Sequence, residues 1–157
     1  MTTATMQPRI DHPVIAEPDA LKAMHTLSKV AQRAGLPEQT GYLVHLRASQ
    51  INGCSVCVEM HSRELREAGA AEERIATVAA WREAPYFSDA ERAALELTEA
   101  ATRIADRPDP VPDEIWDEAA RHYDEQELRA LVIEIVTINA WNRFNCITRQ
   151  VAGQWGG

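Results

Sequence analysis

Apolar residues recur every three to four positions along most of the chain, which is the spacing of one face of an α-helix. The clearest case is near the C-terminus, where Asp124 and Glu127 have the spacing of a helix capping box. The helix predicted from there reaches Arg149 and has a stripe of Leu128, Leu131, Val132, Ile135 and Ile138. Ile133 and Val136 lie off this stripe, so the helix is apolar nearly all round. Such a helix is expected at the centre of the core or in a subunit interface.

The same spacing, with start and stop residues, predicts six earlier helices. Their approximate ranges are 18–34, 37–52, 54–68, 71–82, 89–106 and 112–122. No segment alternates apolar and polar residues in the manner of a β-strand. Pro8 and Pro13 disfavour helix in residues 1–17, which are expected to form an extended N-terminal arm. The prediction is an all-α bundle of about seven helices over residues 18–157.

Composition narrows the class of protein. The chain has 157 residues, of which 45% are hydrophobic, so it can bury a core without disulfides or metals. Its formal net charge of −8 opposes contact with nucleic-acid phosphates. No apolar run approaches the roughly 20 residues that cross a bilayer, and the first ten residues lack a signal-peptide core. We therefore expect a cytoplasmic protein with neither a nucleic-acid nor a membrane partner.

Three cysteines carry the most informative pattern, because Cys54 and Cys57 are close and Cys146 is distant. Two close cysteines and a third far away are typical of a redox or metal site rather than of a disulfide framework. The Asn-Gly turn at residues 52–53 starts a new helix near Cys54. Cys54, Cys57 and His61 are then three and four residues apart, so they share one helix face.

This geometry suits thiol chemistry. The positive end of a helix favours a thiolate, and His61 can take or return a proton. The spacing of three lets the two sulfurs form a disulfide with little backbone movement. These arguments leave the attacking sulfur open, since Cys54 is nearer the helix start and Cys57 is better placed for His61.

Two other interpretations of the cysteines remain. They can be buried core thiols, or zinc ligands together with His61 and either Cys146 or His45. A zinc site usually brings a second ligand pair from elsewhere in the chain, and none is visible. Cys146 is expected to be a packed thiol, and His12 has no partner that the sequence identifies. Glu96 and Glu99 are expected on a solvated helix face.

Residues 46–61, with the sequence LRASQINGCSVCVEMH, resemble the alkylhydroperoxidase AhpD / carboxymuconolactone decarboxylase-like family. Residues 81–85 and 138–143 resemble further segments of it, and the similarity runs from about Ala20 to Val151. The resemblance implies an AhpD-like all-α fold that forms homo-oligomers, often trimers or hexamers. It also implies peroxidase or disulfide reductase activity without a metal or organic cofactor.

The resemblance further assigns roles to site residues. Cys57, the cysteine nearer the histidine, attacks a small-molecule peroxide and becomes a sulfenic acid. Cys54 resolves it to a disulfide while His61 handles the proton. A dithiol or lipoyl-protein partner then reduces the pair.

One position departs from the family pattern, in which a glutamate usually lies twelve residues before the first cysteine. Here that residue is Tyr42, a far weaker base. Three outcomes are open: Tyr42 supports a weaker relay, His45 one turn later substitutes for it, or peroxidase activity is low.

Two rival functions remain as alternatives. One is a carboxymuconolactone decarboxylase-like lyase that uses His61 as acid or base on a small lactone. That chemistry has no use for a cysteine pair. The other is a non-enzymatic oligomer that senses redox state or binds zinc.

Overall fold

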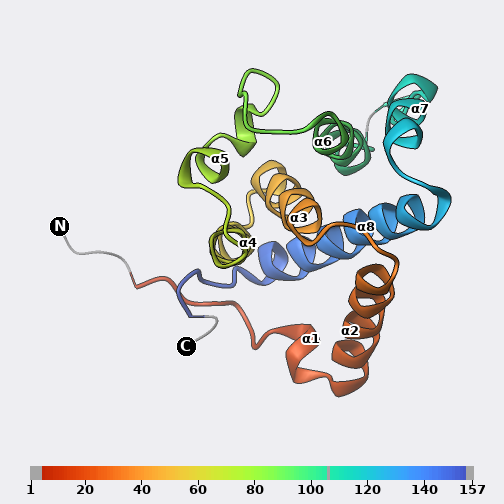
Figure 1. The fold of residues 1–157 in the computed structure, drawn as a ribbon. Coiled ribbons are helices and arrows are strands. Elements are labelled where there is room, and N and C mark those ends of the chain that lie inside the picture. Colours follow the sequence, from red (N-terminus) through yellow and green to blue (C-terminus); the bar gives the residue numbers. More distant parts are fainter. Residues whose placement is uncertain (1–4, 106, 155–157) are drawn as a thin grey trace.

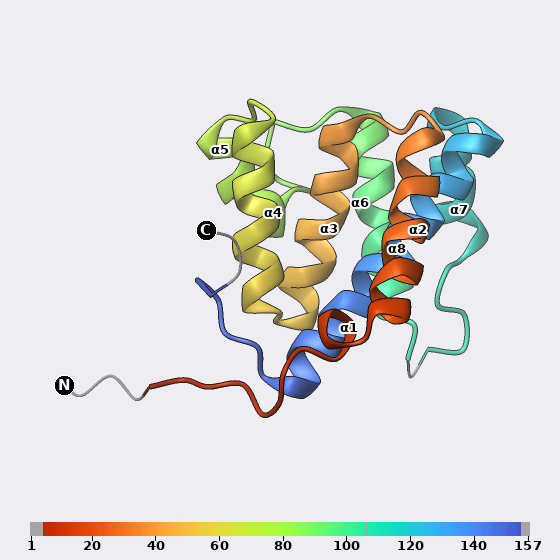
Figure 2. The ribbon, with the colours of Figure 1, turned by 90° about the horizontal axis from the view of Figure 1, so that it is seen from below.

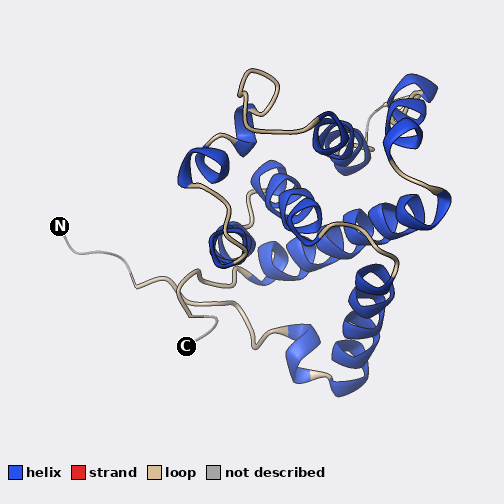
Figure 3. Cartoon of the chain, in the orientation of Figure 1, coloured by secondary structure: helices blue, strands red, loops and turns tan. Residues whose placement is uncertain are grey.

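The computed structural model describes residues 5–105 and 107–154, and every regular element in these ranges is a helix (Figure 3). The all-α prediction is therefore confirmed for the described residues. The elements are α1 (Pro13–Ala16), α2 (Pro18–Arg33), α3 (Glu38–Asn52), α4 (Ser55–Glu67), α5 (Glu72–Ala76), the 3₁₀-helix η1 (Val78–Ala80), α6 (Asp89–Thr102), α7 (Asp113–His122) and α8 (Glu125–Thr148).

Helix α8 is the centre of the bundle, as its apolar sequence predicts. It packs against α2, α3, α4, α6 and α7 (Figure 1). Helix α3 packs between α4 and α6, whereas α2 lies apart from α6 and packs on α8 (Figures 1 and 2). Leu131 and Ile138 of α8 are almost fully buried, whereas Val132 and Val136 on its outer face are exposed. No helix in the described ranges is long and apolar enough to cross a membrane.

Local sequence signals fix the helix ends that matter for the site. The capping box predicted at Asp124 forms, and a second one forms at Ser88, each closed by the glutamate three residues later. Gly53 ends α3 with a φ of 69°, a left-handed conformation that glycine adopts without strain. This turn makes Cys54 the N-cap residue of α4.

Two predicted helices differ from those observed. Residues 71–82 form α5 and η1 instead of one helix, because buried Ile75, Val78 and Trp81 are spaced by three residues, the period of a 3₁₀-helix. Helix α6 ends at Thr102, before a connector whose prolines at 108 and 110 disfavour helix. Asp106, the predicted end, lies outside the described residues.

The N-terminal segment is not extended throughout, because residues 13–16 form the single turn α1. His12 caps this turn, and Val14 is completely buried. The segment is attached to the end of α8, where the Arg9 backbone N–H donates to the Thr148 carbonyl (2.8 Å) and the Arg9 guanidinium donates to the Ile147 carbonyl (3.0 Å). The segment before residue 18, predicted as a separate arm, therefore packs on the bundle in its described part. Residues 1–4 and 155–157 lie outside the described residues.

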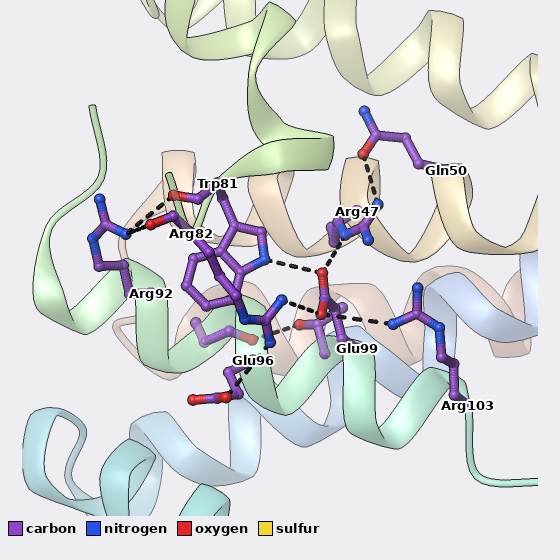
Figure 4. Close-up of polar contacts among 10 residues, drawn as sticks. Arg47, Gln50, Trp81, Arg82, Arg92, Glu96, Glu99 and Arg103 are labelled. Carbon is purple, nitrogen blue, oxygen red and sulfur yellow. Dashed lines mark hydrogen bonds and ion pairs between the residues drawn. The ribbon is translucent and has the colours of Figure 1, made fainter. Parts of the chain in front are cut away.

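A buried carboxylate joins three parts of the bundle (Figure 4). Glu99 of α6 accepts hydrogen bonds from Arg47 of α3 (2.6 Å), the Trp81 indole N–H (3.0 Å) and Arg82 (2.6 Å). Arg103 lies 3.6 Å from the same carboxylate. The prediction that Glu99 is on a solvated face is wrong, because its neighbours on α3 and after η1 cover it. Trp81 is a core residue.

Candidate active site

The cysteine pair lies at the junction of α3 and α4. Cys54 is the N-cap of α4, and its Sγ accepts the backbone N–H of Cys57 at 3.3 Å. The two cysteines are joined as a disulfide, and both are buried, with exposed fractions of 2% and 0%. The predicted spacing therefore brings the sulfurs into bonding contact at the positive end of a helix. A thiolate formed here is stabilised by that end of the helix.

His61 lies one turn further along α4 and lines the same cavity as Cys57. Its Nδ1 is 2.6 Å from Oε2 of Glu64, so we assign the proton to Nδ1, which donates to the carboxylate. The buried Nε2 then carries a lone pair and has no hydrogen-bond partner among the described residues. Burial lowers the pKa of His61, and this outweighs the hydrogen bond from Nδ1 to Glu64, which alone would raise the pKa. His61 is thus a neutral, oriented base.

A second histidine, His45 of α3, stacks obliquely near His61 with 4.7 Å between the ring centroids. Its Nε2 is 2.6 Å from Oε2 of Glu134, a buried carboxylate on α8. His45 Nδ1 is buried and has no hydrogen-bond partner within residues 5–105 and 107–154. Two carboxylate-held imidazoles therefore lie side by side, each with one ring nitrogen unpaired in this part of the chain.

Tyr42 also lines this cavity, but its hydroxyl donates to Oε1 of Glu38 at 3.1 Å. Partial burial raises its pKa to about 12, and the hydrogen bond to Glu38 adds to the rise. A tyrosine with this pKa is not a base near neutral pH. Two other carboxylates line the cavity, Glu64 beside His61 and Glu134 beside His45.

The cavity has a volume of 360 Å³ and lies between α1, α2, α3, α4 and α8. Four of the five predicted site residues line it, namely Tyr42, His45, Cys57 and His61. The fifth, Cys54, is reached through its disulfide to Cys57. Much of the remaining wall is apolar, including Ile15, Leu21, Val56, Met60, Ile138 and Trp141. A chamber that combines apolar walls with convergent polar groups is typical of a small-molecule site.

Sequence reasoning missed Glu64, Glu134, Asn145 and His12, all of which line the cavity. Glu64 is detectable by its helical spacing from His61, and Glu134 by its charge within an apolar helix. His12 and Asn145 gave no signal, because they are 133 residues apart and meet only in the fold.

The alternatives for the cysteines can be compared with the structure. The described residues contain no group of three or more His, Cys, Asp or Glu side chains arranged to hold a metal ion. Cys146 is an exposed thiol, so its predicted packing in the core is wrong. It lies on the outer side of α8, where Sγ is 3.7 Å from the Asn52 carbonyl oxygen.

Fold and site together define an all-helical protein with a buried, disulfide-forming Cys-x-x-Cys pair beside a histidine. The model of the carboxymuconolactone decarboxylase family matches residues 18–100. The chain therefore belongs to the AhpD/carboxymuconolactone decarboxylase-like family.

Two curated relatives are similar to the chain in sequence. The chain is 38% identical to the uncharacterized protein YdfG of Bacillus subtilis (strain 168) over 140 residues, which cover 89% of this chain and 93% of YdfG. It is 36% identical to the uncharacterized protein YnjA of Escherichia coli (strain K12) over 114 residues, covering 73% of this chain and 61% of YnjA.

Solved structures share the fold. A protein of unknown function from Agrobacterium tumefaciens, described as a candidate antioxidant defence protein AhpD, has a TM-score of 0.85 and 36% identity, covering 93% of this chain and 98% of that one. The debrominase Bmp8 has a TM-score of 0.79 and 21% identity, covering 90% of this chain and 75% of that one. At this identity the likeness to the debrominase concerns the fold alone.

Proposed function

We propose that this protein is a thiol-dependent peroxidase, or disulfide reductase, that cycles between a Cys54–Cys57 dithiol and disulfide. The observation that carries the proposal is the disulfide at the positive end of α4, next to an apolar chamber. The chamber also holds the buried His61 Nε2, which has no hydrogen-bond partner among the described residues. A lyase of the family type would use His61 but would leave the cysteine pair without a role.

The proposed cycle begins with the dithiol form. His61 Nε2 accepts the Cys57 thiol proton, and the thiolate attacks a peroxide oxygen. A sulfur–oxygen bond forms, the oxygen–oxygen bond breaks, and the leaving alkoxide takes the proton from His61. Cys54 then attacks the sulfenic sulfur, so the disulfide forms and water leaves. A dithiol or lipoyl-protein partner returns two electrons and two protons, and no metal or organic cofactor takes part.

The substrate proposed for this chamber is a small organic hydroperoxide. Apolar side chains from α1, α2, α4 and α8 line the chamber that Cys57 also lines, and they favour an alkyl group over bulk water. This proposal is tested by following peroxide loss with the reduced full-length protein and a regenerating dithiol. Comparing cumene hydroperoxide with hydrogen peroxide identifies the preferred oxidant. Comparing lipoyl protein with thioredoxin and small thiols identifies the preferred reductant.

Oligomerisation is part of the same proposal. The resemblance to the family implies a trimer or hexamer, and exposed Ile104, Trp116, Val132 and Val136 support it. All four line an apolar surface hollow between α6, α7 and α8. Exposed apolar patches of this kind typically mark contact surfaces.

His45 is proposed to take the role that a carboxylate at position 42 would have, because Glu134 orients it beside His61. We expect His45→Gln to lower the rate of peroxide consumption by about 10- to 100-fold, within the usual range for acid–base groups. Tyr42→Phe is the matched control and should change the rate by less than about threefold, since its hydroxyl donates to Glu38 at the exposed start of α3 and not to either histidine. Steady-state assays of the two variants distinguish the relays, and a larger loss in Tyr42→Phe would assign the relay to Tyr42.

The pH profile follows from the lowered pKa of His61. The active form needs neutral His61, so the rate should be constant near pH 7 and fall as the pH drops through this pKa, below the ordinary value of about 6.5. Peroxide consumption measured from pH 4.5 to 8 checks the position of this acid limb. A limb centred above pH 7 would mean that another group controls the rate.

A further inference from the structure

A chain of hydrogen bonds joins the N-terminal segment to the sulfur of Cys57. His12 Nδ1 accepts the backbone N–H groups of Val14 and Ile15 at 3.1 and 3.3 Å. His12 Nε2 lies 3.0 Å from Oδ1 of Asn145 on α8, and Asn145 Nδ2 lies 3.1 Å from Cys57 Sγ. Both His12 and Asn145 are 6% exposed, so these contacts are largely shielded from bulk water.

The hydrogen bonds from His12 to Cys57 determine which atom donates at each step. Because Nδ1 of His12 accepts two N–H groups, the imidazole proton must be on Nε2. Nε2 then donates to the amide oxygen of Asn145, which turns the amide nitrogen toward the sulfur. Asn145 can therefore only donate to Cys57 Sγ in this arrangement. The capping of α1 thus determines which amide atom faces the disulfide.

Other contacts hold His12 in place independently of Asn145. Arg9 is hydrogen-bonded to the end of α8, and the neighbouring Val14 is completely buried. The His12 ring also packs against Trp141 of α8, with 5.7 Å between the ring centroids. The donor to Cys57 is thus oriented before any charge develops on the sulfur. A dipole that is already oriented stabilises a developing charge without the cost of reorganisation.

We propose that Asn145 is a catalytic residue that stabilises the thiolate of Cys57, and that His12 is its positioning residue. This inference rests on the proposed function and names the sulfur that leaves during reduction. A thiolate of the reductant attacks Cys54 Sγ, and a bond forms between these two sulfurs. The Cys54–Cys57 bond breaks, and its electron pair stays on Cys57, where the Asn145 N–H is already in place.

Cys54 has a donor too, but of a different origin. Its Sγ accepts the backbone N–H of Cys57, which no side-chain substitution removes. Asn145 is therefore the side chain whose hydrogen bond favours negative charge on Cys57 over Cys54. A hydrogen bond to the charged form lowers the pKa of a thiol, and a thiol of lower pKa leaves faster. The same hydrogen bond stabilises the dithiol form and makes the pair easier to reduce.

Asn145→Asp is the decisive variant, because it keeps the shape and the acceptor for His12 but replaces the N–H donor with a carboxylate oxygen. The reduced full-length protein is alkylated with iodoacetamide over a range of pH, and Cys57 is followed by peptide mass spectrometry. We expect the pH midpoint for Cys57 to rise by about one unit or more. In glutathione buffers, the equilibrium constant for reduction should fall about tenfold, which is about 30 mV for a two-electron couple.

Two variants of His12 distinguish its role in orienting Asn145 from its role in capping α1. His12→Asn can still cap α1 but cannot reach Asn145, so it should shift both readouts in the same direction by about threefold. His12→Gln presents an amide N–H near the place of Nε2 and should restore the native values. These two variants carry the test alone if Asn145→Asp does not fold.

Unchanged midpoint and potential in Asn145→Asp, or equal shifts in both His12 variants, would overturn the inference. Neither readout uses peroxide. A protein that shows these shifts but consumes no peroxide would therefore contradict only the proposed function.

Discussion

Replacement of Cys57 with serine is expected to abolish peroxide consumption, with a loss of at least about 1,000-fold. The serine hydroxyl is not ionised near neutral pH, so neither the helix end nor His61 can make it a comparable nucleophile. Cys57 is also the sulfur that lines the cavity, whereas Cys54 does not. The measurement is the initial rate of hydroperoxide loss with a saturating dithiol.

Cys146→Ser is the matched control, because it makes the same chemical change outside the proposed cycle. Cys146 is exposed and does not line the cavity that holds Cys57 and His61. The variant should retain the native rate within about twofold. Native turnover in Cys57→Ser, or loss of turnover only in Cys146→Ser, would contradict the assignment of the reacting sulfur.

Replacement of Glu99 with alanine is expected to lower the free energy of unfolding by about 3–5 kcal/mol, because it leaves Arg47 buried without its carboxylate. Arg47, Trp81 and Arg82 all donate to Glu99, so one substitution removes the junction between α3, α6 and the segment after η1. For a chain of this length, the loss corresponds to a fall in Tm of roughly 6–20 °C. Urea unfolding followed by circular dichroism measures it.

Glu96→Ala serves as the control for this prediction. Glu96 lies three residues before Glu99, nearly one turn earlier on α6, and approaches the exposed end of Arg82 at 3.5 Å. Its removal should cost less than about 1 kcal/mol, as for other exposed ion pairs. Equal losses for the two variants would mean that the buried network around Glu99 is not a stabilising junction.

The pH dependence of the Glu99 contribution has a defined sign. Burial alone would raise the pKa of Glu99, but hydrogen bonds from Arg82, Trp81 and Arg47 outweigh it and lower the pKa. The folded state therefore favours the carboxylate, and this stabilisation is complete above the unfolded pKa of about 4.3. The stabilisation is lost as the pH falls through the lower pKa of Glu99 in the folded state. The free energies of unfolding of Glu99→Ala and Glu96→Ala should therefore differ less in stronger acid.

Local signals were sufficient for the helices and for the cysteine pair. Capping boxes, Gly53 and the spacing from Cys54 to His61 all act within one or two turns, so the sequence predicts them directly. The break between α5 and η1 was not predicted, because only burial of Val78 and Trp81 against other helices favours a period of three over the helical period.

The parts of the site that the sequence did not predict come from segments that are distant along the chain. Tyr42 left the proton relay open in the sequence, and the carboxylate that contacts His45 is Glu134, which lies 89 residues further along the chain. The contact of His12 with Asn145 likewise depends on the N-terminal segment packing on α8. A single sequence contains no period or spacing that relates such positions. Glu99 was misjudged because its covering residues belong to other elements.

The stoichiometry of oxidation tests the central claim most directly. The full-length protein is fully reduced, freed of reductant and treated with one equivalent of cumene hydroperoxide, and its thiols are then counted and mapped. The account predicts that two of the three thiols disappear together and that the protein mass falls by two hydrogens, with Cys54 joined to Cys57 and Cys146 still free. Three remaining thiols and unconsumed peroxide would contradict it, as would oxidation confined to Cys146.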